Sequence, residues 1–122
     1  MNKYLGITAL LGALTIVLGA FGAHALEETL SENALKSFET AVRYQMYHII
    51  VLLFVNSYSE FSLKTKTIVS YLFFAGILFF SGSIYAITLG VNPKDIWFIT
   101  PLGGLFFILG WLKMGISYFK KA

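Results

Sequence analysis

Four long apolar segments decide what this chain can fold into. They cover about residues 4–24, 42–58, 67–89 and 98–118, and a membrane-spanning helix needs about 20 such residues to cross about 30 Å of hydrocarbon. The segments are continuously apolar rather than alternating, which excludes transmembrane β-strands. Only 12% of the residues are charged, whereas soluble domains carry about a quarter. We therefore predict an all-α membrane protein, an antiparallel four-helix transmembrane bundle that forms a single integral membrane domain over residues 1–122.

The basic side chains lie at the ends of these segments and indicate the topology. Six fall on the side of the termini and three on the opposite side: Lys3, Lys64, Lys66, Lys113, Lys120 and Lys121 against Lys36, Arg43 and Lys94. Loops rich in Lys and Arg stay in the cytoplasm, so both termini are predicted to be cytoplasmic. The same dispersal argues against a nucleic-acid partner, which requires a basic patch.

The first apolar segment carries small side chains along one face. Residues 1–25 resemble a secretory signal, because Ala23-His24-Ala25 has the form of a cleavage site. Their apolar stretch is longer than the usual span of about 7 to 15 residues, and we expect it to be retained. In a helical projection six small side chains share a narrow face: Thr8, Gly12, Thr15, Gly19, Gly22 and Ala23. Such a face lets a second helix approach closely.

The segment from residue 32 to 58 is amphipathic at its start and apolar at its end. We predict that its first part, about 32–43, lies at the outer interface and passes into the second membrane helix, continuously or through a bend. Ser31 alone, or Thr29 with Glu32, can cap its start. In projection it carries a charged stripe, an apolar stripe and a small or polar stripe: Glu32, Lys36, Glu39 and Arg43; Leu35, Phe38, Val42 and Ile49; Ala34, Ser37, Ala41, Gln45 and His48. We expect these stripes to face water, lipid and the glycine face of the first helix, respectively.

Glycine and proline mark the close contacts and irregular parts of the bundle. Asn92-Pro93 is typical of a cap followed by proline at the first helical position. Pro101 is predicted to interrupt the fourth helix just inside the outer boundary, because an interior proline removes a hydrogen bond and kinks the helix. We expect helix packing or backbone breaks at nine positions: Gly12, Gly19, Gly22, Gly82, Pro101, Gly103, Gly104, Gly110 and Trp111.

Polar side chains near the outer ends of the helices form the candidate site. Six are expected to gather there: His24, Tyr44, Gln45, His48, Tyr85 and Thr100. His48 is the strongest candidate, because an ionisable group between membrane helices is costly and needs a partner. Tyr44 and Gln45 are one turn away from it, and Thr100 or Tyr85 could reach it from the same depth.

An ordered set of short motifs resembles one family. The set runs through Gly19-Ala20-Phe21-Gly22-Ala23-His24, Tyr44-Gln45 with His48, Ser81-Gly82-Ser83 with Tyr85, Thr100-Pro101 with Gly103-Gly104, and Gly110-Trp111. It is similar to the domain-of-unknown-function 423 family, which also contains the animal transmembrane protein 256. The resemblance implies a small four-helix, multi-pass protein of the bacterial inner membrane with no established activity.

The residues do not form a recognisable catalytic constellation, so we do not expect an enzyme. The favoured function is a structural or accessory protein that binds lipid or a partner, and its expected partners are the bilayer and either a second copy or another membrane protein. A small proton-coupled transporter or channel that uses His48 is the first alternative. The second is a haem protein ligated by His24 and His48. We expect no metal site, because no carboxylate or cysteine is placed to complete one.

Overall fold

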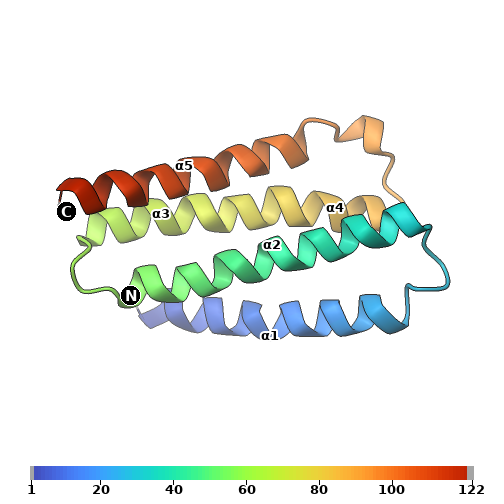
Figure 1. Ribbon diagram of the computed structural model, residues 1–122, viewed down its shortest axis with the longest axis horizontal. Helices are drawn as coiled ribbons and strands as arrows, with labels where there is room; N and C mark the ends of the chain where they lie inside the picture. Colours follow the sequence, from blue (N-terminus) through green and yellow to red (C-terminus); the bar gives the residue numbers. More distant parts are fainter. Residues whose placement is uncertain (1, 121–122) are drawn as a thin grey trace.

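The computed structural model describes residues 2–120, apart from the side chains of Asn2 and Ala23. The described chain is helical with short connections, in the order α1 (Asn2–His24), α2 (Glu32–Ser57), α3 (Leu63–Gly76), the π-helical turn η1 (Ile77–Ser81), α4 (Gly82–Thr88), the 3₁₀ turn η2 (Pro93–Asp95) and α5 (Ile99–Lys120). The segment α3–η1–α4 is one rod, so four rods run antiparallel (Figure 1). This confirms the all-α four-helix bundle.

Both described ends of the chain lie at one end of the bundle, together with the connection between α2 and α3 (Figure 1). We call this the terminal end, and we call the opposite end, where the other two connections lie, the far end. Three helical segments are long and apolar enough to cross a membrane: Lys3–Gly22, Leu63–Thr88 and Ile99–Lys120. Helix α2 has 26 residues, which is long enough to cross as well, but its first half carries the charged stripe.

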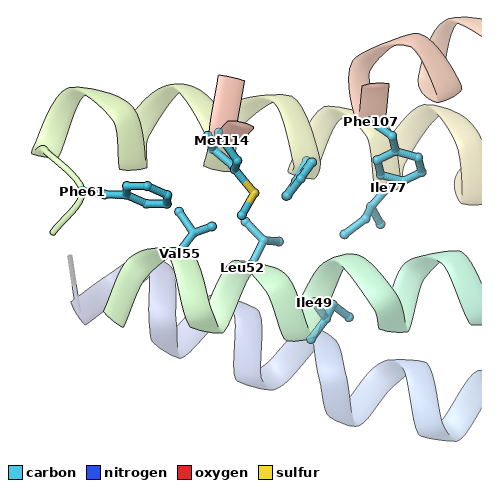
Figure 2. Close-up of a cluster of buried hydrophobic side chains, with 9 residues drawn as sticks. Ile49, Leu52, Val55, Phe61, Ile77, Phe107 and Met114 are labelled. Carbon is cyan, nitrogen blue, oxygen red and sulfur yellow. The ribbon is translucent and has the colours of Figure 1, made fainter. Parts of the chain in front are cut away.

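The hydrophobic core lies among α2, α3, η1 and α5 (Figure 2). Its buried members are Ile49, Leu52, Val55, Phe61, Val69, Phe73, Ile77, Phe107 and Met114. Helix α1 packs chiefly on α2 at the edge of this group. Large apolar side chains of α1 are therefore left exposed, among them Leu10 at 74%. Exposed apolar surface of this kind is suited to lipid rather than water.

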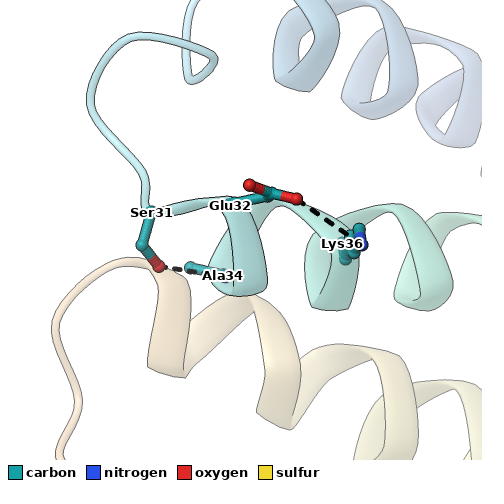
Figure 3. Close-up of polar contacts among 4 residues, drawn as sticks. All are labelled: Ser31, Glu32, Ala34 and Lys36. Atoms are coloured by element: carbon teal, nitrogen blue, oxygen red, sulfur yellow. Dashed lines mark hydrogen bonds and ion pairs between the residues drawn. The ribbon is translucent and has the colours of Figure 1, made fainter.

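Helix α2 is continuous, so the amphipathic segment enters the second membrane helix without a bend. Ser31 is its N-cap, and its hydroxyl accepts a hydrogen bond from the backbone N–H of Ala34 at 3.1 Å. One turn further, Lys36 Nζ lies 3.7 Å from Glu32 Oε1 in an exposed ion pair (Figure 3). The cap is thus made by Ser31 alone, one of the two arrangements that the sequence left open.

The orientation of α2 differs from the expected one. A Cβ on Gly22 would overlap the ring of Phe38, and a Cβ on Gly19 would lie 3.4 Å from Val42 Cγ1. The glycine face of α1 therefore receives the apolar stripe of α2, which was predicted to face lipid. The small or polar stripe turns mainly toward the rod α3–η1–α4, where Ala41 is fully buried. Its Gln45 nevertheless bonds to Thr15 on the glycine face, as expected. The physical reason is volume, because large side chains fill the hollows that glycines leave whereas small ones do not.

Pro101 does not interrupt a helix, and the predicted kink was wrong. Helix α5 begins at Ile99, so Pro101 sits in its first turn, where a backbone N–H has no intrahelical partner in any case. The ladder begins with the N–H of Leu102, which donates to the carbonyl of Phe98 at 3.1 Å. The second predicted cap is present, because Asn92 Oδ1 accepts from the N–H of Lys94 at 3.0 Å.

Gly103 marks the closest approach between α5 and the rod that contains η1. A Cβ at this position would collide with the backbone of Phe79 and Phe80. Those two residues belong to the π-helical turn, where one residue more than usual is fitted into a helical turn. Nothing in the sequence indicates this turn, since its residues are as apolar as those around them. Gly76 and Gly110 likewise make room for the rings of Phe107 and Phe73.

Candidate functional site

His48 lies inside the bundle with both ring nitrogens engaged. Its side chain is 4% exposed. The Nδ1 atom is 2.7 Å from the backbone carbonyl of Tyr44, and since a carbonyl can only accept, Nδ1 carries the hydrogen. The Nε2 atom accepts a hydrogen bond from the indole Nε1–H of Trp111 at 3.0 Å. These two bonds select the neutral imidazole with its proton on Nδ1.

Aromatic rings enclose this imidazole on its remaining sides. The ring of Phe107 stacks on it, with centroids 3.6 Å apart and planes 9° from parallel. The ring of Phe73 meets it edge to face at 4.9 Å. Helix α2 thus presents His48 to side chains from α3 and α5. Among the described side chains that touch the ring, the indole of Trp111 is a donor and the phenyl rings are apolar, so none offers a second acceptor to a protonated imidazole.

Gln45 connects three helices one turn further toward the far end. Its Nε2 donates to Thr15 Oγ1 of α1 at 2.6 Å, and its Oε1 accepts from the hydroxyl of Tyr85 in α4 at 2.7 Å. Thr15 in turn donates to the carbonyl of Leu11 at 2.7 Å. Gln45 is 2% exposed, and in hydrocarbon such bonds replace those that water would make.

Two serine contacts continue this network across the bundle. The Ser81 hydroxyl donates to the carbonyl of Ala41 at 2.7 Å, which joins the π-helical turn to α2. The hydroxyls of Ser83 and Thr100 are hydrogen-bonded to each other and join α4 to α5. The buried polar side chains therefore hold the helices together. Among the residues described, Asn56 Oδ1 is the one buried side-chain oxygen or nitrogen without a hydrogen-bond partner.

The six residues expected to gather are divided by the structure. Gln45 and Tyr85 bond directly, and His48 is one turn from Gln45 on the same helix. Thr100 contacts Ser83 and not His48. Tyr44 contributes its carbonyl to His48, while its ring packs against Phe80 with centroids 5.0 Å apart.

His24 lies apart from the other five. It is exposed at the far end of α1, whereas Gly12 of α1 packs beside Ile49, next to His48. Twelve residues separate Gly12 from His24, which is about 18 Å along a helix. The two imidazoles therefore do not face a common ligand. The described residues also contain no group of three His, Asp or Glu that could hold a metal ion.

Sequence reasoning missed the residues that surround His48. Trp111 was expected as a packing residue, and neither Phe73 nor Phe107 was considered as a neighbour. One signal could have pointed to Trp111, because a buried neutral imidazole requires a donor and an indole N–H in an apolar segment requires an acceptor. Thr15 was placed on the glycine face and Gln45 on the stripe expected to meet that face, but the bond between the two was not named.

The surface formed by α1 and α2 carries an elongated hollow, which we call the α1–α2 groove. Its inner part has a volume of about 420 Å³ and is lined by Thr15, Ile16, Gly19, Ala20, Val42, Arg43, Met46 and Tyr47. Its outer part, nearer the far end, has a volume of about 230 Å³ and is lined by Gly19, Phe38, Glu39, Val42 and Arg43. Gly19, Val42 and Arg43 are common to both parts. Side chains on its two walls, such as Ile16 and Tyr47, are exposed, so the groove opens sideways from the bundle.

Comparisons with known proteins find relatives along the whole chain. Residues 18–104 match the family described as protein of unknown function (DUF423). A UPF0382 membrane protein of Staphylococcus saprophyticus is 42% identical over 98% of this chain and 99% of its own length. The corresponding figures are 39%, 98% and 96% for a UPF0382 membrane protein of Haemophilus influenzae, and 34%, 98% and 98% for UPF0382 membrane protein YwdK of Bacillus subtilis. No solved structure matches the chain.

Proposed function

This chain belongs to the DUF423 family, and we propose that it is a non-catalytic accessory membrane protein that binds a phospholipid chain in the α1–α2 groove. The observation that carries the proposal is a contrast between two parts of the molecule. The polar interior is occupied by bonds within the bundle, whereas the groove is open, apolar and directed sideways. A site that is open to the bilayer selects ligands from the bilayer.

The interior gives little support to the transport hypothesis. A proton carrier at His48 must exchange a proton with a pathway, but Nδ1 already donates to Tyr44 and Nε2 already accepts from Trp111. Protonation of Nε2 would set two donors against each other and break the Trp111 bond. A haem bound by two histidines is likewise disfavoured, because His24 and His48 lie far apart along the helices and the ring of Phe107 covers one face of His48.

For its placement in the membrane, we propose a multi-pass protein of the bacterial inner membrane with both termini in the cytoplasm. Among the described residues, five lysines lie toward the terminal end and three basic residues toward the far end: Lys3, Lys64, Lys66, Lys113 and Lys120 against Lys36, Arg43 and Lys94. The excess at the terminal end favours the cytoplasmic side for that end. The α1–α2 groove then opens toward the outer leaflet.

Lipid retention by the full-length chain tests the proposed function. The protein is purified from membranes in a mild detergent, and the phospholipid that remains bound is quantified by mass spectrometry. Ala20 is an exposed residue on the wall of the groove, so Ala20→Phe fills the groove without entering the core. We expect this variant to lose the retained lipid.

Leu10→Phe is the matched control, because Leu10 is an exposed apolar residue of the same helix that does not line the groove. It should retain lipid like the unmodified chain. Equal retention by both variants would contradict the proposed site. Absence of bound lipid together with crosslinking between two chains at position 20 would assign the groove to a helix of a second copy instead.

A further inference from the structure

We infer that the α1–α2 groove recognises the headgroup of its lipid and selects one that carries both a phosphate and a primary ammonium, as phosphatidylethanolamine does. In this assignment Arg43 binds the phosphate and Glu39 binds the ammonium. The inference rests on the proposed function, because it names the lipid whose chain would occupy the groove. The evidence for it is the pair of charged side chains, Glu39 and Arg43, that line the outer part of the groove.

Arg43 and Glu39 both line the outer part of the groove, and they are not paired with each other. They are four residues apart on α2, the same spacing at which Glu32 and Lys36 form an ion pair. That pair is the one salt bridge found among residues 2–120. Arg43 instead donates a hydrogen bond to Thr40 Oγ1 at 3.1 Å. Two opposite charges on one wall of an apolar groove are thus left open to an external partner.

The depth of the two charges fits a headgroup. The apolar span of α1 ends at Gly22, and Gly22 and Gly19 pack beside Phe38 and Val42 of α2. Arg43 follows Val42, so it lies about 5 Å inside the end of the span, and Glu39 lies about 6 Å further out. In a phospholipid the phosphate is next to the glycerol and the ammonium is further out, so each charge meets the group of opposite sign.

The chemistry of the two side chains favours this ligand over other headgroups. A guanidinium binds phosphate oxygens in a bidentate manner. A carboxylate accepts hydrogen bonds from a primary ammonium, whereas a quaternary ammonium has no N–H to donate. A glycerol headgroup places no cation opposite Glu39. The inner part of the groove, lined by Ile16, Ala20 and Met46 among others, then receives an acyl chain below the phosphate.

Competition among three lipids tests the inference. The purified full-length chain is mixed with equimolar phosphatidylethanolamine, phosphatidylglycerol and phosphatidylcholine of identical acyl chains, and bound lipid is resolved by native mass spectrometry. We expect phosphatidylethanolamine to exceed each of the others about two- to fivefold, the factor that an exposed ion pair supplies. Glu39→Gln should reduce this preference to about onefold while retaining total lipid, because the phosphate contact remains. Arg43→Gln should reduce the binding of all three lipids.

The control uses the same charge on the same stripe outside the groove. Glu32→Gln removes a carboxylate that pairs with Lys36 and should leave the preference unchanged. If the unmodified chain retains lipid that Ala20→Phe removes, but shows no preference or one that Glu39→Gln leaves intact, the headgroup inference is wrong and the proposed function stands. If the unmodified chain retains no lipid at all, both fail. Circular dichroism confirms that each variant keeps its helical content.

Discussion

The indole of Trp111 donates a hydrogen bond to Nε2 of His48 across 3.0 Å, and it thereby ties α5 to α2 through a buried polar group. The opposite nitrogen of the same ring is held by its own helix at the carbonyl of Tyr44. An imidazole held at both nitrogens has one orientation and one tautomer. We therefore expect the bond between Trp111 and His48 to contribute to the stability of the bundle.

Trp111→Phe removes the donor to His48 Nε2 and leaves a buried acceptor without a partner. We expect a loss of about 1 kcal/mol in the free energy of unfolding, which lies between the average of about 0.6 and the maximum of about 1.7 kcal/mol measured for hydrogen bonds between membrane helices. Unfolding in mixed micelles measures it. Trp97→Phe is the control, because Trp97 is 73% exposed and makes no described side-chain hydrogen bond. Equal stability of the two variants would contradict the assigned bond.

Tyr85→Phe removes one hydroxyl from the network around Gln45. The Oε1 atom of Gln45 then loses its partner while the bond from its Nε2 to Thr15 remains. We expect a destabilisation of about 0.6 kcal/mol or somewhat more, and a smaller effect for Tyr118→Phe, since Tyr118 is 46% exposed. A double-mutant cycle with Gln45→Leu should show that the two changes are not additive. Full additivity would mean that the two side chains do not interact.

Gly103→Ala adds a methyl group where the backbone of Phe80 stands. A backbone cannot rotate away as a side chain can, so α5 must shift, at a cost of about 1 to 3 kcal/mol. Gly115→Ala on the same helix meets nothing within 4 Å and should be neutral or slightly stabilising. Thermal unfolding of both variants checks the difference. A fully stable Gly103→Ala variant would show that α5 does not approach the rod as closely as described.

The proposed topology makes a labelling prediction. The chain has no cysteine, so Ser59→Cys and Asp95→Cys each provide a single thiol at an exposed position, the first at the terminal end and the second at the far end. In intact spheroplasts an impermeant maleimide should label position 95 and not position 59. A permeant maleimide should label both. The reverse pattern would place the termini outside the cytoplasm.

The arrangement around His48 also predicts what spectroscopy and transport assays will find. The two histidines do not share a ligand site, so the protein purified from haem-supplemented cells should give no Soret band. In proteoliposomes, His48→Ala should leave proton flux at the level of the unmodified chain. A Soret band that His48→Ala abolishes would favour the haem hypothesis. A proton flux that depends on His48 would favour the transporter.

Much of the fold could be predicted because the bilayer restricts the choices. Apolar length gave the four rods, and side-chain chemistry gave the caps at Ser31 and Asn92, both of which the structure contains. The predicted orientation of α2 was wrong because a helical projection sorts side chains by polarity, whereas the packing of α2 on α1 is decided by side-chain volume. Phe38 fills the hollow at Gly22, and this fit depends on the shapes of the two residues rather than on their polarity.

The sequence predicts which polar residues belong to the candidate site, but not which of them form hydrogen bonds with each other. Gln45 and His48 were expected to find partners, and they do, but the partners come from helices whose relative rotation the sequence leaves undetermined. Trp111 reaches His48 from 63 positions along the chain. Pro101 was misplaced for a simpler reason, since the same proline is a kink inside a helix and a good starter in its first turn, and the boundary at Ile99 decides between the two.

The π-helical turn at Ile77–Ser81 determines which way the side chains of α4 point. Each residue in a regular helix rotates the next by about 100°, but the wide turn takes up one additional residue, so the residues after it keep the direction they would have without it. Winding the same residues into a regular α-helix would instead rotate everything after the turn by about 100°, and it would swing Ser83 away from Thr100 and Tyr85 away from Gln45. The π-helical turn therefore lets residues before it and residues after it face their partners at the same time. A regular helix of the same length could satisfy only one of the two groups.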